Sequence, residues 1–450
     1  MSDNHAGTPQ DSAISRRHFL ALGAAGAAGA ALAAVGPTAF AAGSANASPL
    51  PRRTTRSRAA NGTVSFLSWD TIAVMQPVVA LFEKMNPSIK IELEFETANS
   101  YIDTLATRLL AGTAPDVFIY TSQNKAALNK GNYVLDLTDA PSTAVMAAAN
   151  RNFMSSGDKV YGFSPASWSS GAIWNLRLLD KVGGTPPATW ADFLEMCAKL
   201  KKLGVVPYTD AAQVGTGLEA LIGSYWRTQG LLAPGQVLGV KGDQLIFSGK
   251  STFAKEWAVP LAEYNQLYSA GLVPSSVVAL TGAEVDSQLA NGQLAALGSG
   301  PWDVAAVQLE NPKLAMKMLP IPGAKAGEDF WCGAPNEGWA VYSKSKVIDA
   351  ALEFIDFLAS PEGLKIYAKN SGDIITTTNY ASPVPSSLTE CAVAARSSNY
   401  YFTGISWPNA YSQAMGTVAI ADIEIMIQGK MNPGQVLRAM DAEVKRLTGK

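Results

Sequence analysis

The sequence predicts an α/β fold made of two lobes, and three observations support this prediction. With 450 residues, the chain is too long for one hydrophobic core and long enough for two lobes of ordinary size. From residue 63 onwards, apolar strands alternate with amphipathic helices, which is typical of a largely parallel sheet. Apolar residues make up 48% and charged residues 16% of the chain, a composition typical of globular proteins.

The first part of this pattern predicts one doubly wound lobe. Asn86-Pro87 ends the first helix, and Gly112 ends the second, because proline and glycine terminate helices. We expect strands at 63–69, 89–95 and 116–120, and helices at 72–85, 100–111 and 123–129.

The pattern changes between residues 161 and 174, where Gly, Ser, Pro and aromatic residues replace the strong periodicity. Helices then dominate, and no fixed-period repeat is present, which excludes solenoids and propellers. We expect helices at 190–203, 218–229, 251–269, 284–291, 348–359, 413–428 and 433–447, and strands at 295–298, 316–319 and 337–342.

Residues 1–47 resemble a twin-arginine export signal. Ser15-Arg16-Arg17-His18-Phe19-Leu20 opens a run rich in Ala and Gly, which is short and weakly apolar for a membrane anchor. Cleavage after Ala42 and cleavage after Ala47 both remain open. No cysteine lies near either position, so we expect no lipid-modified cysteine, and residues 48–61 are expected to form a basic linker.

The two histidines, His5 and His18, both lie inside this predicted signal. Without it, the chain has no histidine, which excludes Ser-His-Asp and Cys-His catalysis and histidine-bound zinc. The formal net charge is −2, so no basic field is expected to attract nucleic acid. We therefore expect no cofactor, no metal and no nucleic-acid partner.

The chain has three cysteines and no CxxC motif, so redox and metal sites built on cysteine are not expected. An oxidising compartment permits a disulfide, and Cys332 and Cys391 are the expected pair. Cys197 lies within a helical pattern and is expected to be a buried thiol.

Several separated segments resemble one protein family in the order in which that family has them. The most specific is Leu109–Val117, which contains A-G-T-A-P-D-V; weaker segments are 159–165, 173–175, 187–190, 289–302, 319–323 and 350–362. Together they make residues 62–450 resemble the extracellular solute-binding proteins of ABC importers, in the sugar-binding family 1 that includes maltose-binding protein. Trp174 and Asn336–Trp339 depart from the family pattern, which leaves the ligand open.

This resemblance implies a type II periplasmic-binding-protein fold whose two lobes close like a flytrap around the ligand. Lobe 1 would comprise residues 62–164 and 335–375, and lobe 2 residues 165–330 and 385–450. The lobes would be joined by crossings near 164–167, 327–335 and 371–385. The protein would be a monomer without enzymatic activity, periplasmic or extracellular, that delivers a carbohydrate to the transmembrane subunits of an ABC permease.

The residue types independently favour a sugar site. Sugars present flat C–H faces and a rim of hydroxyls, which aromatic rings and carboxylates or amides complement. Three sequence pairs place a ring beside a carboxylate at a strand end or in a loop, where α/β lobes bind ligands. The candidate ligand-binding residues are Trp69, Asp70, Asn99, Tyr120, Trp168, Trp226, Trp302, Asp303, Glu337, Trp339 and Trp407.

Two other functions remain open at this point. Acidic residues beside aromatic rings would also bind a cationic or amino-acid-like solute. A secreted glycoside hydrolase would need two carboxylates at a set separation, which Asp70, Asp303 and Glu337 could supply, but no motif fixes such a pair.

Overall fold

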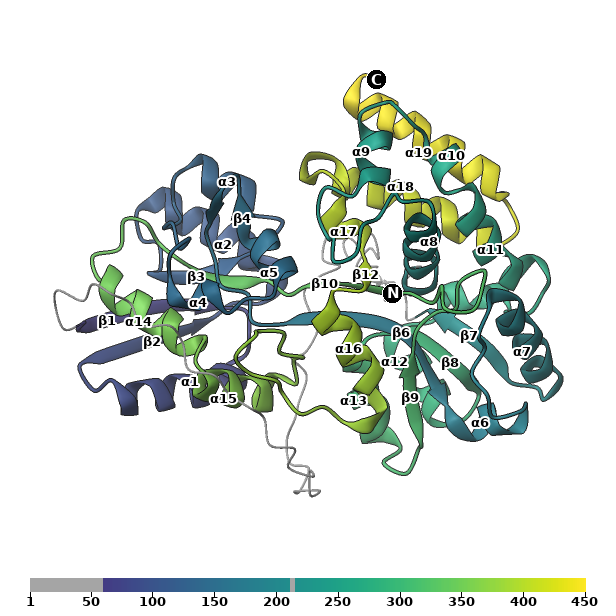
Figure 1. Cartoon of the computed structure of the whole chain (residues 1–450), viewed down its shortest axis with the longest axis horizontal. Coiled ribbons are helices and arrows are strands. Elements are labelled where there is room, and N and C mark those ends of the chain that lie inside the picture. Colours follow the sequence, from purple (N-terminus) through teal and green to yellow (C-terminus); the bar gives the residue numbers. More distant parts are fainter. Residues whose placement is uncertain (1–59, 211–214) are drawn as a thin grey trace, which may run out of the picture.

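The structure is a computed structural model that describes residues 60–210 and 215–450 (Figure 1). It contains two β-sheets with helices packed around each of them, arranged side by side along the long axis of the molecule (Figure 1). The α/β class predicted from the sequence is confirmed. The predicted export signal and most of the predicted basic linker lie outside the described residues.

The first sheet has four strands in the order β11-β3-β1-β2. Their bounds are Gly338–Val341 for β11, Val117–Tyr120 for β3, Gly62–Ser68 for β1 and Ile89–Phe95 for β2. β1 pairs in parallel with both β2 and β3, whereas β11 runs antiparallel to β3. The carboxyl ends of the three parallel strands and the start of β11 therefore meet at one edge.

Seven helices and a small hairpin accompany this sheet, and we call the whole unit lobe 1. The helices are α1 (Ile72–Met85), α2 (Ala98–Ala111), α3 (Lys125–Lys130), α4 (Pro141–Ala144), α5 (Ala148–Met154), α14 (Ile348–Leu358) and α15 (Pro361–Ser371). The hairpin consists of β4 (Ser155–Ser156) and β5 (Lys159–Val160).

The second sheet is mixed, with the strand order β12-β10-β6-β8-β7 and with β9 also paired to β6. Its strands are β6 (Ser167–Asn175), β7 (Val206–Asp210), β8 (Leu294–Ser299), β9 (Met316–Leu319), β10 (Trp331–Pro335) and β12 (Tyr400–Tyr401). β7 and β8 are parallel, and β6 runs antiparallel to β8, β9 and β10.

The remaining helices surround the second sheet, and together with it they form lobe 2. They are α6 (Leu176–Lys181), α7 (Trp190–Lys202), α8 (Thr216–Thr228), α9 (Lys241–Phe247), α10 (Phe253–Glu256), α11 (Ala258–Ser269), α12 (Gly282–Ala290), α13 (Pro301–Glu310), α16 (Thr389–Ser397), α17 (Thr403–Ser406), α18 (Asn409–Ile427) and α19 (Pro433–Thr448). Two 3₁₀ turns lie at Ser275–Ala279 and Ser386–Leu388.

Local sequence signals explain where several helices begin and end. Thr189 and Thr281 form capping boxes with the acidic side chains three residues later, which satisfies free N–H groups at the starts of α7 and α12. Gly112 has a φ of 72°, a left-handed conformation that glycine adopts without strain, and it ends α2 as predicted.

Two sequence predictions are corrected in lobe 2. The expected helix at 251–269 is divided into α10 and α11, with Trp257 between them. The segment from 161 to 174, which has no clear periodicity, contains most of β6, the longest strand described. β6 is buried along nearly its whole length, so its sequence lacks the alternation that marks a half-exposed strand.

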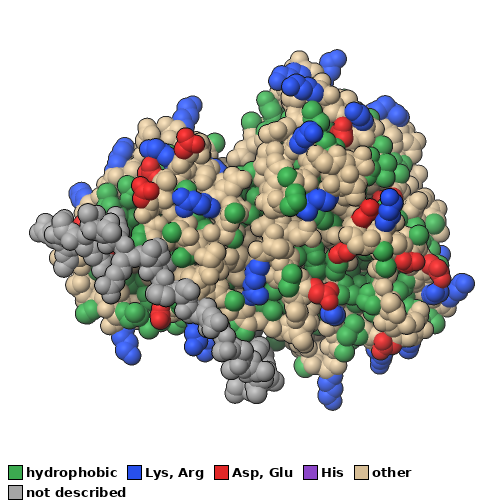
Figure 2. Space-filling model, in the orientation of Figure 1, with side chains coloured by type: hydrophobic (Ala, Val, Ile, Leu, Met, Phe, Trp, Pro, Cys, Tyr) green, Lys and Arg blue, Asp and Glu red, His purple; other side chains and the backbone are tan. Residues whose placement is uncertain are grey.

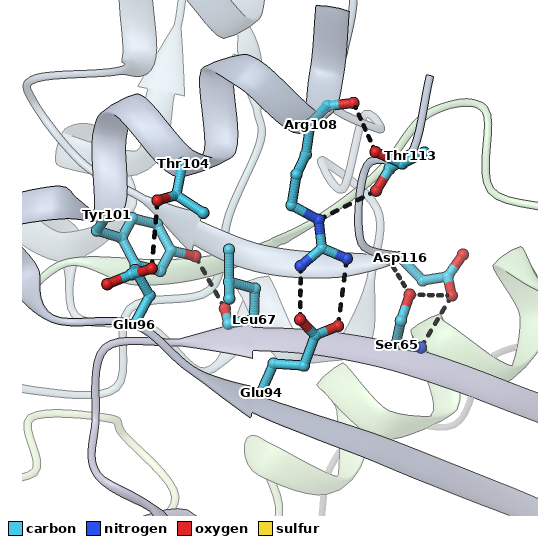
Figure 3. Close-up of polar contacts among 9 residues, drawn as sticks. All are labelled: Ser65, Leu67, Glu94, Glu96, Tyr101, Thr104, Arg108, Thr113 and Asp116. Atoms are coloured by element: carbon cyan, nitrogen blue, oxygen red, sulfur yellow. Dashed lines mark hydrogen bonds and ion pairs between the residues drawn. The ribbon is translucent and has the colours of Figure 1, made fainter. Parts of the chain in front are cut away.

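Polar contacts attach α2 to the sheet of lobe 1 (Figure 3). The hydroxyl of Tyr101 donates to the carbonyl of Leu67 in β1 at 2.8 Å. The same hydroxyl accepts from the N–H of Ile119 in β3 at 2.8 Å. Arg108 forms a two-pronged ion pair with Glu94 of β2. These contacts keep the carboxyl ends of β1 and β3 at a fixed distance from each other.

Three chain segments cross between the lobes side by side. The N–H of Asn336 donates to the carbonyl of Ala166 at 2.9 Å, and the N–H of Ser167 donates to the carbonyl of Ile374 at 3.2 Å. The N–H of Thr376 donates to the carbonyl of Pro165 at 3.0 Å. Two lobes joined only by a few adjacent segments can rotate about them, so we interpret this junction as a hinge. The lobe boundaries given by the sequence remain a prediction.

The expected disulfide between Cys332 and Cys391 is not formed, since all three cysteines are free and buried. Cys332 lies directly opposite Ser170 in the pairing of β10 with β6, so both side chains are on one face of the sheet. The thiol of Cys391 instead donates to the carbonyl of Ser169 at 3.1 Å and contacts its hydroxyl. Neighbouring residues of a strand point to opposite faces, so the sheet separates the two thiols.

Candidate functional site

The lobe 1 side of the site lies at the sheet edge where the parallel strands end. Trp69 and Asp70 follow directly after β1. Gly338 is paired with Tyr120, the last residue of β3, so Glu337 reaches the same edge from a distant part of the sequence. Asp373 joins them from the third crossing segment, just after α15.

Asp70, Glu337 and Asp373 form an acidic cluster at this edge. Burial raises the pKa of Asp70 to about 7, and the negative charge of Asp373 raises it further. Burial also raises the pKa of Glu337 to about 8; its own backbone N–H opposes this, and the charges of Asp373 and Asp70 add to it. Within residues 60–210 and 215–450, none of the three forms an ion pair with Lys or Arg.

The three carboxyl groups differ in how far the protein itself satisfies them. Asp373 accepts hydrogen bonds from the hydroxyl of Tyr367 at 2.7 Å and from the amide of Asn336 at 3.2 Å. The carboxyl group of Asp70 accepts none from the described residues, although its backbone N–H donates to Ser68 at 3.0 Å. Asp70 and Glu337 are both partly exposed, so their oxygens are available to donors from a ligand.

The aromatic residues predicted for the lobe 1 side of the site differ in how exposed they are. Trp69 is partly exposed and stands edge-on against Tyr101, with ring centres 5.4 Å apart. Trp339 is only 3% exposed and packs between Phe163 and Tyr367. Tyr120 is fully buried, and its hydroxyl pairs with Asn129. The expectation that Trp339 and Tyr120 face a ligand is therefore corrected: both belong to the hydrophobic core of lobe 1.

Lobe 2 contributes an aromatic wall made of Trp168, Trp302 and Phe402. The ring of Trp168 lies edge-on to Trp302, with centres 5.9 Å apart, and to Phe402, with centres 5.2 Å apart. All three rings are partly exposed. Trp168 lies at the start of β6, and Trp302 lies in the first turn of α13. Each ring therefore lies at the end of its element that is nearer to lobe 1.

Two carboxyl groups lie around the helix that carries Trp302. Asp303 accepts a hydrogen bond from the hydroxyl of Ser299, and burial raises its pKa. Burial raises the pKa of Asp286 in α12 to about 7, and the charges of Asp303 and Glu310 add to this effect. One oxygen of Asp286 is buried without a hydrogen-bond partner among the described residues.

Two further tryptophans predicted for the site belong to the core of lobe 2. Trp226 is fully buried in α8, and its ring N–H donates to the carbonyl of Glu256 at 3.2 Å. Trp407 is 4% exposed and packs against Phe253 and Trp257. Both predictions are corrected, because a ring enclosed in this way offers no face for a ligand. The side chain of Asn99 lies outside the part of the structure that is described.

Sequence reasoning missed two residues of the site. Asp373 follows a helix and precedes no strand, so nothing in the local pattern links it to the end of β1. Phe402 follows Tyr400-Tyr401, a pair of the kind that packing in the core also explains. The succession of three aromatic residues is the one signal that could have indicated an exposed ring at this position.

The two lobes also contact each other away from the crossing segments, beside a cavity of about 240 Å³. The amide of Asn409, at the start of α18, donates to the carbonyl of Ser122 in lobe 1 at 2.6 Å. Lys125 donates to the carbonyl of Phe153 at 2.7 Å, and burial lowers its pKa to about 8. Figure 2 shows a notch between the lobes at the upper edge of the molecule. The cavity is lined by Ser122, Lys125, Phe153, Leu238 and residues 405–409.

This arrangement is suited to non-covalent recognition. Aromatic rings in lobe 2 and open carboxyl oxygens in lobe 1 are the groups that complement a ligand with both apolar faces and hydrogen-bond donors. Among the described residues, no group of His, Cys, Asp and Glu side chains has the geometry of a metal site. No helix in the same part of the chain is both long and apolar enough to cross a membrane.

Comparison with known protein sequences identifies relatives of this chain. Residues 68–365 match the family model described as bacterial extracellular solute-binding protein. The melibiose/raffinose/stachyose-binding protein MelE of Bacillus subtilis is 25% identical over 393 residues, which cover 82% of this chain and 85% of MelE. The multiple sugar-binding protein of Streptococcus mutans is 21% identical over 66% of this chain and 70% of its own length.

Comparison with solved structures agrees with the sequence comparison. A family 1 extracellular solute-binding protein from Bifidobacterium longum subsp. infantis has a TM-score of 0.76 and 26% identity, covering 86% of this chain and all of the other. RafE of Streptococcus pneumoniae, in its apo form, has a TM-score of 0.70 and 16% identity, covering 88% of this chain and all of RafE. The predicted two-lobed type II fold is thus confirmed, and the chain belongs to the bacterial extracellular solute-binding proteins.

Proposed function

We propose that this protein is the substrate-binding component of an ABC importer and captures a sugar or oligosaccharide outside the cytoplasmic membrane. The observation that carries this proposal is that an aromatic wall in lobe 2 and open carboxyl oxygens in lobe 1 both lie next to the segments that join the lobes. The relatives MelE and the multiple sugar-binding protein, which are named for the sugars they bind, support it.

The residues act in two ways on such a ligand. Trp168, Trp302 and Phe402 offer ring faces and edges to the C–H faces of a sugar ring. Asp70 and Glu337 accept hydrogen bonds from sugar hydroxyls, and these bonds become stronger when closure removes water. Solute-binding proteins require no covalent step, so the glycoside hydrolase considered above is set aside.

Ligand binding would be coupled to movement of the lobes. A ligand that touches both walls binds the closed state more tightly than the open state and therefore shifts the equilibrium towards closure. The three hydrogen-bonded crossing segments supply the hinge for this motion. The closed form, as a monomer, would then dock on the transmembrane subunits of the permease.

Export would follow the twin-arginine route, as Ser15–Leu20 and the weakly apolar run after it suggest. Residues 48–61 would then link the folded lobes to the processed N-terminus. N-terminal sequencing of the protein released from the producing cell would locate the cleavage site, for which Ala42 and Ala47 are the two candidates.

A calorimetric titration tests the proposed ligand class. The purified chain from residue 48 onwards is titrated with melibiose, raffinose, stachyose, maltotriose and chitotriose, and separately with spermidine and a mixture of amino acids. We expect heat from at least one sugar and a higher Tm with that sugar, because a ligand of the folded state stabilises it. Binding of spermidine or an amino acid with no response to any sugar would contradict the proposal.

A further inference from the structure

Two buried carboxyl groups of lobe 2 hold the same short segment, residues 400–409. Glu219 in α8 accepts hydrogen bonds from the backbone N–H of Thr403 at 3.0 Å and from its hydroxyl at 2.5 Å. Asp243 in α9 accepts from the hydroxyl of Tyr401 at 3.1 Å and from the hydroxyl of Ser406. Glu219 and Asp243 are 8% and 2% exposed, respectively.

These carboxyl groups are committed to the segment rather than to a cation. In the part of the chain that the structure describes, neither Glu219 nor Asp243 forms an ion pair. Burial raises the pKa of Glu219 to about 8 and that of Asp243 to about 7, against the opposing effect of the donated hydrogen bonds. A buried acid without an ion-pair partner is costly unless hydrogen bonds satisfy it, and here the hydrogen-bond donors come from residues 401–406.

The segment presents two groups to the space between the lobes. Phe402 contacts Trp168 and so completes the aromatic wall. Asn409 reaches across to the carbonyl of Ser122 in lobe 1. Between these two residues, Ile405 and Ser406 line the cavity that separates the lobes.

We propose that Glu219 and Asp243 are positioning residues of the binding site. They fix residues 400–409 so that Phe402 completes the wall that faces the ligand. They also hold Asn409 in place to bond to Ser122 of lobe 1 when the lobes are closed, a contact that we call the clasp. The role of Phe402 rests on the proposed function. The clasp does not, because the bond between Asn409 and Ser122 joins the two lobes without any ligand.

The clasp would increase ligand affinity without touching the ligand. If the bond between Asn409 and Ser122 exists only in the closed state, it increases the ratio of closed to open protein by about fivefold, a typical effect of one hydrogen bond. The apparent affinity of any ligand that binds the closed state changes in proportion to that population.

The first measurement follows the distance between the lobes in the ligand-free protein. Asp103→Cys in lobe 1 and Lys430→Cys in lobe 2 replace exposed residues and can carry spin labels, while the three native thiols are buried. We expect Asn409→Ala to increase the population with a long distance. Gln413→Ala, which changes an exposed residue one turn further along α18, should leave the distances unchanged.

The second measurement tests the two positioning residues through their partners, which avoids removing a buried carboxyl group. Thr403→Val removes the hydroxyl bonded to Glu219 but keeps the shape of the side chain, and Thr403→Ser keeps the hydroxyl. Ser406→Ala makes the corresponding change at Asp243. We expect Thr403→Val and Ser406→Ala to shift the distances as Asn409→Ala does, and Thr403→Ser to behave like the unmodified protein.

The same variants are then titrated with a sugar that binds the unmodified protein, with raffinose as the first probe. We expect Asn409→Ala, Thr403→Val and Ser406→Ala to weaken its binding three- to tenfold. Unchanged distances and unchanged affinity in Asn409→Ala and Thr403→Val would overturn the proposal. Shifted distances without binding of any sugar would retain the clasp and instead contradict the proposed function.

Discussion

Carboxyl groups of the two lobes share pKa values raised by burial but differ in their hydrogen-bond partners. In lobe 2, Asp210 accepts hydrogen bonds from the hydroxyls of Tyr208 at 2.5 Å and Tyr264 at 2.7 Å and from the N–H of Gly217 at 3.1 Å. In lobe 1, Asp70 accepts none from the described residues. A carboxyl group whose partners come from its own chain stabilises the fold, whereas one left open at a cleft is available to a ligand.

The largest loss of stability is expected in lobe 2, from Asp243→Asn. The amide nitrogen that replaces one carboxylate oxygen can only donate, so Tyr401, which contacts both oxygens of Asp243, loses one acceptor and the new N–H groups are buried without an acceptor. We expect the free energy of unfolding to fall by about 3 kcal/mol, measured by urea denaturation. The control Asp180→Asn replaces an exposed carboxyl group of the same lobe and should change little. Equal effects of the two variants would contradict this account of lobe 2.

The largest loss of affinity is expected from Trp168→Ala. This change removes the ring that contacts both Trp302 and Phe402, so the aromatic wall loses its central member. We expect sugar binding to weaken by about 30-fold, corresponding to about 2 kcal/mol for a central aromatic anchor. Titration calorimetry measures this change, and Trp69→Ala provides the matched variant on the other wall. Affinity that remained within twofold would exclude Trp168 from the site.

Asp70→Asn is expected to affect binding and stability in opposite directions. The amide loses the charged acceptor, so sugar affinity should fall about tenfold. The ligand-free protein should become more stable at pH 8, because the variant removes the cost of burying the charge of Asp70 and the repulsion between Asp70 and Asp373. Calorimetry and thermal unfolding measure the two effects, with Asp103→Asn as an exposed control. A lower Tm in Asp70→Asn would mean that its carboxyl group supports the fold, as those of lobe 2 do.

The stability of the protein should depend on pH, because acids of both lobes have raised pKa values. In the folded protein the pKa values of Asp70 and Glu337 are about 7 and about 8, above their ordinary values, so the folded state holds these protons more tightly. Their contribution is complete near pH 4 and is lost as the pH rises through 7 to 8. Unfolding at pH 5.5 and 8.5 should show higher stability at pH 5.5, by up to about 1.4 kcal/mol per group and pH unit.

The variant with both Asp70→Asn and Glu337→Gln should flatten this pH dependence in part. The remaining slope would come from the buried acids of lobe 2, among them Glu219 and Asp243, whose pKa values are also raised by burial. An unchanged slope in the double variant would show that the lobe 1 carboxyl groups do not titrate in this range.

The smallest effect is expected from reduction. Because Cys332 and Cys391 are free thiols on opposite faces of the second sheet, dithiothreitol should change the Tm by less than about 1 °C. A thiol assay on the unfolded protein should detect all three cysteines without prior reduction. A drop of several degrees on reduction would restore the disulfide that the sequence led us to expect.

The parts of the site that sequence reasoning located are those that follow a strand directly. Trp69 and Asp70 come after a clear apolar strand, and Trp302 and Asp303 come after β8, so their position at a sheet edge follows from the chain order. Glu337 was located through the turn before β11. One local pattern therefore determines both the strand and its end at these positions, and the role of these residues in ligand binding stays a prediction.

The residues that were misplaced depend on distant contacts or on helix faces. Trp226 lies four residues after Ile222 and eight after Leu218, the spacing of one buried helix face, and this signal outweighs its aromatic character. Trp407 follows a short helix whose packing is set by lobe 2 as a whole. The disulfide was misjudged because chain order does not reveal which face of a strand a residue occupies when the strand itself is not recognised.

The pairing of β3 with β11 has a consequence for the order in which the chain folds. Phe118 and Ala340 are partners in this sheet, although they lie about 220 positions apart, and almost all of the second sheet is encoded between them. During synthesis, β3, which is buried along its whole length in the folded protein, therefore remains an edge strand with one side unpaired until the ribosome has released residue 341. Such an edge attracts other strands, so the nascent chain is most exposed to aggregation over this interval.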